Sequence, residues 1–187
     1  LMREDMASRA KKEKRAVAWD LLGEHNRSNA MSAIAAAHHA GVPVAEACAA
    51  LCEFKGVKRR LEIIYQSHNL TVYDDFAHHP SAIKKTLEGV RSHAPNDRIV
   101  AVIEPRTHTM SLGTLQADLI SCTAAANQTY WFKGENISWD LSKLVQQSES
   151  PGEVISDMNR LIDQLKPEAS STQRTHLILM SNGEFEG

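Results

Sequence analysis

Short apolar runs alternate with helical patterns from residue 61 onward, and this alternation constrains the fold more than any other feature of the sequence. From residue 70 onward, four runs rich in β-branched or aromatic residues predict strands, and the segments between them carry apolar residues at helical spacing. Such a chain buries a mostly parallel sheet between helices, so the sequence predicts an α/β fold. The predicted strands are LTVYDD (70–75), RIVAVIE (98–104), QTYWF (128–132) and HLILMS (176–181); the predicted helices cover 80–93, 112–122 and one stretch on each side of Pro151.

The first 60 residues have a different pattern. Residues 29–41 and 43–54 are alanine-rich and predict two successive helices, because Gly41 can end the first and Pro43 suits the first position of the second. The runs LEIIYQ (61–66) and LTVYDD, separated by a polar turn, then predict a hairpin. We therefore place a domain boundary near residue 60, which divides the chain into 1–60 and 61–187.

The composition favours a globular protein without a nucleic-acid or membrane partner. Of the 187 residues, 42% are hydrophobic, which is enough to build a core. The formal net charge is −2, so no general electrostatic attraction draws the chain to nucleic acid or to an anionic membrane. No apolar run approaches the roughly eighteen residues that a membrane span needs. Cys48 and Cys52 lie four apart in a helical pattern, which favours a helix face over a zinc site and fits a reducing cytoplasm.

The stretch DDFAHHP (74–80) collects two carboxylates and two imidazoles where a predicted strand ends. Because Pro80 suits the first turn of a helix, we expect Asp74, Asp75, His78 and His79 to lie in the loop at the carboxyl edge of the sheet. Sites of α/β enzymes lie at this edge, where aspartate can accept hydrogen bonds from sugar hydroxyls or hold a metal and histidine can contact phosphate. A helix N-cap with exposed loop histidines is the alternative.

Two more polar loops follow predicted strands. Arg106 comes directly after the most apolar strand and can hold a carboxylate or a phosphate through two hydrogen bonds. The last predicted strand leads into SNG, and such residues are common in ordinary turns. Three polar loops on one edge make a binding site the better interpretation. The candidates in these two loops are Arg106, Thr107, His108, Thr109, Ser181 and Asn182.

A fourth candidate lies before the boundary, in GEHNRSNA (23–30). Asn26 and Asn29 are three residues apart at the start of a predicted helix and so share one face, with His25 beside them. Amide groups can pair with the edge of an adenine. An Asn or Ser helix cap is the alternative.

Taken together, the motifs resemble the carboxyl-terminal part of the Mur ligase family. The matching stretches are GEHNRSNAMSAIAAAHHAGV, FKGVKRRLE, TVYDDFAHHPSAIKKTL, AVIEPRTHTMSLG and LILMSNG, in this order. The resemblance implies a Rossmann-like carboxyl-terminal domain over 61–187, which brings the peptide substrate, preceded by the helical end of a central ATP-binding domain over 1–60. It also implies that the rest of the ligase lies on the same polypeptide, outside this chain, and that this chain alone is inactive.

The family resemblance also implies roles for individual residues. His25, Asn26 and Asn29 correspond to contacts with adenine and ribose, and Asp75 to a contact with the ribose hydroxyls. Arg60 would approach the phosphates and His78 the phosphate or acyl-phosphate region. Arg106 would hold a carboxylate of the incoming peptide, in a pocket lined by Thr107, His108, Thr109, Ser181 and Asn182.

The implied reaction is ATP-dependent ligation in the bacterial cytoplasm during peptidoglycan recycling. The carboxylate of UDP-N-acetylmuramate would be activated as an acyl phosphate and attacked by the amine of L-alanyl-γ-D-glutamyl-meso-diaminopimelate, with ATP and Mg²⁺ bound mostly by domains that this chain lacks. A ligase that adds L-alanine to UDP-N-acetylmuramate and a non-catalytic peptide- or nucleotide-binding module remain alternatives. Two features depart from the family pattern: no GxxxxGK[ST] loop is present, and Glu184 and Glu186 follow SNG where further glycines are expected.

Overall fold

The computed structural model describes residues 16–19, 21–105, 116–134, 137, 139–183 and 185. The chain divides into two compact units, one containing Arg27–Lys55 and the other containing Leu21–Asn26 with Gly56–Gly187. Along the chain, the first unit gives way to the second between Lys55 and Gly56, and the domain boundary near residue 60 stays a prediction.

Two helices form the first unit, as the sequence predicts. The first three residues of helix α1 (Glu24–His39) belong to the other unit, and the rest of α1 lies in this one. Helix α2 (Val44–Glu53) follows after a short turn. Gly41 adopts a φ of +93°, and the amide of Val42 donates to the carbonyl of Ala37, so a left-handed glycine ends α1. Pro43 is the N-cap residue of α2 rather than its first helical residue.

The second unit is built on a six-stranded sheet in the order β1-β2-β6-β3-β4-β5. Strands β1 and β2 form the predicted antiparallel hairpin, and every other neighbouring pair is parallel. The sequence did not predict β5, which follows Pro151. The strands are β1 (Glu62–Gln66), β2 (Leu70–Asp75), β3 (Arg98–Ile103), β4 (Gln128–Phe132), β5 (Gly152–Ile155) and β6 (Thr175–Met180).

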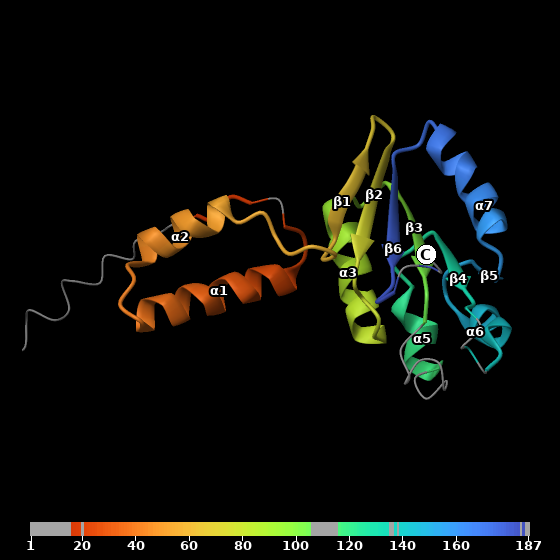
Figure 1. The fold of residues 1–187 in the computed structure, drawn as a ribbon, viewed down its shortest axis with the longest axis horizontal. Helices are drawn as coiled ribbons and strands as arrows, with labels where there is room; N and C mark the ends of the chain where they lie inside the picture. The colour runs from red at the N-terminus through yellow and green to blue at the C-terminus, as the bar shows by residue number, and fades with distance from the viewer. Residues whose placement is uncertain are drawn as a thin grey trace, which may run out of the picture. The chain divides into compact units, whose positions relative to one another are not determined.

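Helices cover both faces of the sheet, as Figure 1 shows. One core lies beneath α3 (Pro80–His93), α5 (Gln116–Cys122) and α6 (Leu141–Gln147), and the other lies beneath α7 (Met158–Ser170). Strand β3 supplies both cores, because Ile99, Ala101 and Ile103 alternate with Val100 and Val102 along it. This double burial explains the uninterrupted apolar run that made β3 the clearest strand in the sequence.

Buried helix residues hold α3 against the sheet. Ile83, Leu87 and Val90 repeat at helical spacing and are fully buried. Burying a large aliphatic side chain contributes about 1.5–3 kcal/mol, so this face fixes the helix that follows the DDFAHHP loop. Among the described helices, none is both long enough and apolar enough to cross a membrane.

Candidate functional site

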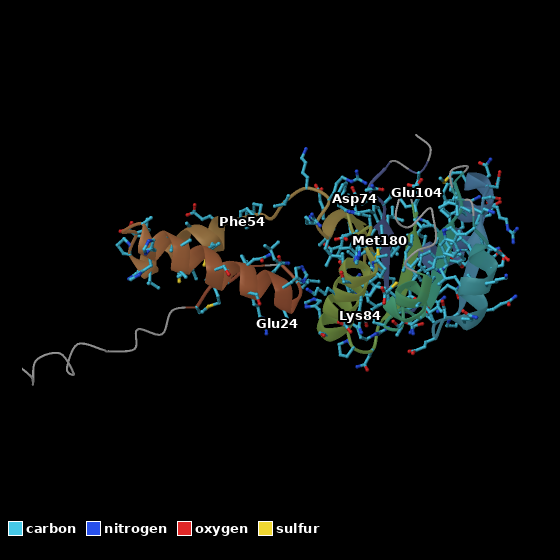
Figure 2. All side chains as sticks on the ribbon, turned by 90° about the horizontal axis from the view of Figure 1, so that it is seen from below. Glu24, Phe54, Asp74, Lys84, Glu104 and Met180 are labelled. Atoms are coloured by element: carbon cyan, nitrogen blue, oxygen red, sulfur yellow. The ribbon has the colours of Figure 1, made fainter. Side chains whose placement is uncertain are left out.

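The carboxyl ends of β2, β6 and β3 lie side by side because β6 lies between β2 and β3. Asp75, Met180 and Ile103 are neighbours across the three strands, so the residues that follow them emerge side by side. Figure 2 labels Asp74, Glu104 and Met180 at the ends of these strands. The sheet thus brings together the DDFAHHP loop, Glu104 and the Ser181–Gly183 loop, as the strand pattern predicts.

Asp75 is buried, with 4% of its surface exposed, and its carboxylate organises the surrounding backbone. Oδ2 accepts from the amide of Leu61 at 2.8 Å, and Oδ1 accepts from the amide of Ala77 at 2.8 Å and from the hydroxyl of Thr86 at 3.4 Å. Burial raises the pKa of this carboxyl, while these hydrogen bonds and the charge of Arg60 act in the opposite direction. Both oxygens are engaged, so a ribose hydroxyl would have to share them, and that role for Asp75 stays a prediction.

Glu104 and Ser181 form a second buried polar pair at the same edge. The hydroxyl of Ser181 donates to Oε2 of Glu104, and the amide of Gly183 donates to that hydroxyl at 2.8 Å. Ser181 is fully buried, which sets the start of the loop. Oδ1 of Asn182 is buried and has no hydrogen-bond partner among the described residues. An orphaned buried amide oxygen is costly, so this atom is available to a donor on a ligand.

Arg59 joins these loops, although no sequence pattern singled it out. Its Nη2 donates to the carbonyls of Ser181 and Gly183, at 2.8 Å each, and its Nε lies 3.2 Å from Oδ2 of Asp74. The guanidinium also lies over the ring of Phe76, 5.4 Å from its centroid. A planar fork that donates in several directions suits this task better than a lysine.

The ring of Phe76 contacts both residues proposed to approach phosphate, Arg60 and His78. The guanidinium of Arg60, an exposed residue, lies 5.6 Å from the ring centroid, and the ring of His78 meets it edge-on at 5.0 Å. Nδ1 of His78 is 2.8 Å from the carbonyl of Phe76 and therefore donates to it. This bond leaves Nε2 of His78 as the ring nitrogen available to a ligand.

His79 has a structural role that the N-cap alternative anticipated. Its Nδ1 accepts from the amide of Ser81 at 3.3 Å, which caps α3, and Pro80 occupies the first turn as expected. Of the two histidines in DDFAHHP, His78 is therefore the better candidate for ligand binding.

The adenine candidates lie in the first two turns of α1. The side-chain amide nitrogen of Asn26 donates to the carbonyl of Leu22 at 2.7 Å, which leaves its oxygen for another partner. His25 packs against Gly23, where φ is +92° and a Cβ atom would lie only 2.7 Å from the imidazole ring. Asn29 is exposed. The side-chain oxygen of Asn26 can offer an acceptor to the exocyclic amine of adenine, and the roles of His25, Asn26 and Asn29 stay predictions.

Several sequence candidates lie outside the described residues: Arg106, Thr107, His108, Thr109, Glu184 and Glu186. Their predicted roles in peptide binding therefore stay predictions. Within the described ranges, no group of three or more His, Cys, Asp or Glu side chains is arranged to hold a metal ion.

The described edge carries groups of both charges at close range. The guanidinium groups of Arg59 and Arg60 lie over Phe76, while Asp74 and Glu104 supply carboxylates. Such a surface suits a ligand that carries both an amine and carboxylates, or a phosphate beside an amine.

Sequence reasoning missed the positioning roles of Arg59 and Phe76 and gave Glu104 no role. The adjacent arginines in KRR and the aromatic residue within DDFAHHP were visible signals, but their partners lie far away in the sequence. Arg59 bonds residues 122 and 124 positions later, and local patterns cannot show such a contact.

Comparison with known proteins identifies relatives of this chain. A family model described as "Mur ligase, glutamate ligase domain" matches residues 59–183. The UDP-N-acetylmuramate–L-alanyl-γ-D-glutamyl-meso-2,6-diaminoheptandioate ligase of Haemophilus influenzae is 41% identical over 172 residues, which cover 91% of this chain and 38% of that protein. The chain thus spans well under half the length of this relative.

One solved structure and one shorter sequence match also belong to ligases that act on UDP-N-acetylmuramate or murein peptides by name. The crystal structure of a murein peptide ligase from Psychrobacter arcticus superposes with a TM-score of 0.66 at 37% identity, covering 95% of this chain and 38% of that one. A UDP-N-acetylmuramate–L-alanine ligase from Roseiflexus castenholzii is 40% identical over 95 residues, which cover 51% of this chain and 20% of that protein. In sequence, the match to the Haemophilus influenzae peptide ligase covers nearly the whole chain, and the match to the Roseiflexus castenholzii L-alanine ligase covers about half of it.

Proposed function

The chain belongs to the Mur ligase family, and from this premise we propose that it is the carboxyl-terminal part of an ATP-dependent ligase that joins UDP-N-acetylmuramate to L-alanyl-γ-D-glutamyl-meso-diaminopimelate. In this proposal the enzyme works in peptidoglycan recycling in the bacterial cytoplasm, and the remainder of the polypeptide supplies most of the ATP, Mg²⁺ and UDP-sugar contacts. ATP would supply the phosphoryl group that activates the sugar carboxylate.

The observation that carries the proposal is the convergence of the DDFAHHP loop, Glu104 and the Ser181–Gly183 loop at one sheet edge, in a chain of which 91% aligns at 41% identity with a ligase named for this tripeptide. A tripeptide with several carboxylates needs more recognition surface than a single amino acid. Among the described residues, the edge offers the exposed guanidinium of Arg60 to phosphate and the unpartnered amide oxygen of Asn182 to the amine of the peptide. Groups held in place in this way can orient the two reactants before the amine attacks.

The residues of this chain divide into two proposed groups. Arg60 and the Nε2 atom of His78 would meet phosphate oxygens, with His25, Asn26, Asn29 and Asp75 near the nucleoside. Ser181 and Asn182, together with Arg106, Thr107, His108 and Thr109, would line the peptide pocket. Cationic side chains placed where negative charge develops account for much of the catalysis in such transfers.

Calorimetric titration of this 187-residue chain with the tripeptide, and with L-alanine as the matched control, tests the proposal. We expect the tripeptide to bind and L-alanine to release no measurable heat. Binding of L-alanine alone would favour the L-alanine ligase. If the tripeptide binds but the complete polypeptide forms no product from UDP-N-acetylmuramate, tripeptide and ATP, the protein is a binding module of the same fold.

A further inference from the structure

We propose that Arg59 is a positioning residue that fixes the Ser181–Gly183 loop relative to Arg60 and His78. The inference rests on the proposed function, because it links the loop expected to hold the peptide to the groups expected to meet phosphate. It assigns to Arg59 a task that is distinct from direct contact with a substrate.

The side chain of Arg59 makes the link directly. One nitrogen, Nη2, donates to two carbonyls of the same loop, at 2.8 Å from Ser181 and 2.8 Å from Gly183. Nε faces Asp74 on the neighbouring strand, so the guanidinium spans the ends of β2 and β6. Because backbone carbonyls accept these bonds, they set the path of the loop whatever its side chains contact.

The backbone of Arg59 is held as firmly as its side chain. Its amide donates to Oε2 of Glu62 at 2.9 Å, and its carbonyl accepts from the amide of Phe76 at 2.7 Å. Its φ is +56°, a left-handed conformation that non-glycine residues rarely adopt. Such strain persists only where the surroundings determine the conformation, as these bonds do.

Leu61 repeats this arrangement on the other side of Arg60. Its φ is +54°, and its amide donates to Oδ2 of Asp75 at 2.8 Å. Arg60 therefore lies between two restrained left-handed residues, while the Phe76 ring meets its guanidinium. Two strained residues flanking a candidate phosphate-binding arginine indicate that its position is controlled closely.

These contacts connect both halves of the proposed reaction through one residue. Phe76 orients Arg60 and His78, and Arg59 bonds both Phe76 and the Ser181–Gly183 loop. Displacement of that loop by about 1 Å would misplace the attacking amine relative to the activated carboxylate, and misplacements of this size slow reactions strongly.

The test compares Arg59→Lys with Arg174→Lys in the 187-residue chain. Arg174 is a matched control, because it also donates to two backbone carbonyls, those of Ser67 and His68, and to the side chain of Thr71. It lies at the amino end of β6, whereas the Ser181–Gly183 loop follows the carboxyl end. Lysine keeps the positive charge and loses the fork at both positions.

Amide hydrogen exchange followed by NMR and the affinity for the tripeptide are the two measurements. We expect Arg59→Lys to speed exchange at Gly183 by about tenfold or more and to weaken tripeptide binding by about tenfold, since bonds from a charged donor are lost. Arg174→Lys should change exchange only near Ser67 and leave tripeptide binding unchanged.

A third variant, Arg59→Gly, provides a rescue test. Glycine accepts the left-handed φ without strain, so only the side chain is lost. We expect free guanidinium ions to restore protection at Gly183, and methylammonium ions at the same concentration to have no such effect.

Unchanged exchange at Gly183 in Arg59→Lys, or an equal change in Arg174→Lys, would overturn the positioning role. Faster exchange with unchanged tripeptide affinity would overturn its link to the proposed function. If the wild-type chain binds no tripeptide, the proposed function fails at this edge, and the exchange comparison alone still decides whether Arg59 holds the loop.

Discussion

At the scale of single residues, a buried carboxylate holds the backbone of the candidate site in place. Asp75 accepts hydrogen bonds from Leu61 and Ala77, one on each of its oxygens. In Asp75→Asn the amide group must face one of these N–H donors, which then loses its acceptor. We expect the variant to lower the free energy of unfolding by about 1–3 kcal/mol, measured by urea denaturation.

Asp74→Asn is the control for this prediction. The side chain of Asp74 is 27% exposed and pairs with Arg59, so its neutralisation should cost less than about 1 kcal/mol. Equal losses in the two variants would contradict the central structural role of Asp75.

The pH dependence of stability gives a separate test of Asp75. Burial is the main cause that raises the pKa of its carboxyl in the folded chain above the ordinary value of about 3.9. At pH values between the pKa of this carboxyl in the unfolded chain and its higher pKa in the folded chain, the folded state binds more protons than the unfolded state. The stabilisation that proton binding gives the folded state is therefore lost as the pH rises through the folded-state pKa. We expect the stability of wild type minus that of Asp75→Asn to decrease as the pH rises above about 4. An increase over the same range would mean that the hydrogen bonds outweigh burial.

Part of the candidate site could be predicted from the residue types in the sequence. The carboxyl edge was predictable because Asp75 and Ser181 each end an apolar run, and parallel strands align such ends. The engagement of Asp75 by backbone amides and the capping role of His79 were not predictable in this way, since both depend on where the chain turns after the strand. The positioning role of Arg59 could not be predicted because its partners, Ser181 and Gly183, lie in the last loop of the sequence.

At the scale of elements, a charge pair fastens α7 to the start of β3. Arg98 donates to both oxygens of Glu168, at 2.9–3.1 Å, and these hydrogen bonds to the carboxylate raise the pKa of Arg98. Glu168 is mostly buried although it lies on a surface helix.

We expect Glu168→Gln to destabilise the fold by about 1 kcal/mol, a value reduced for the partial exposure of Arg98. The matched control is Asp163→Asn, which neutralises an exposed pair with Lys166 on the same helix and should cost under about 0.5 kcal/mol. Thermal unfolding monitored by circular dichroism compares the two. A larger effect at Asp163 would show that α7 is not held through Glu168.

Most elements of the fold could be predicted because their patterns are long or strongly apolar. The run at residues 98–104 supplies both cores through β3, and α3 shows a clear helical period. Strand β5 was missed because it has only four residues, begins with glycine and carries a glutamate. It forms because β4 offers a parallel edge, which no local pattern shows.

At the scale of the whole molecule, the carboxyl edge of the sheet is the proposed place of peptide recognition. The opposite edge serves as an internal reference, since it also contains a polar network, in which His176 lies between Tyr73 and Asp97. Both networks are partly or fully buried and contain charged groups, so polarity alone does not distinguish them. Only the carboxyl edge combines strained backbone at Arg59 with an orphaned amide oxygen at Asn182, among the residues that the structure describes.

The most direct measurement is NMR mapping of the amide signals of the 187-residue chain during titration with L-alanyl-γ-D-glutamyl-meso-diaminopimelate. The account predicts saturable shifts at Phe76, His78, Ser181 and Gly183, with the signals of Asp97 and His176 unchanged. Shifts confined to the amino edge, or none at tripeptide concentrations of several millimolar, would contradict the claim that the carboxyl edge recognises the peptide.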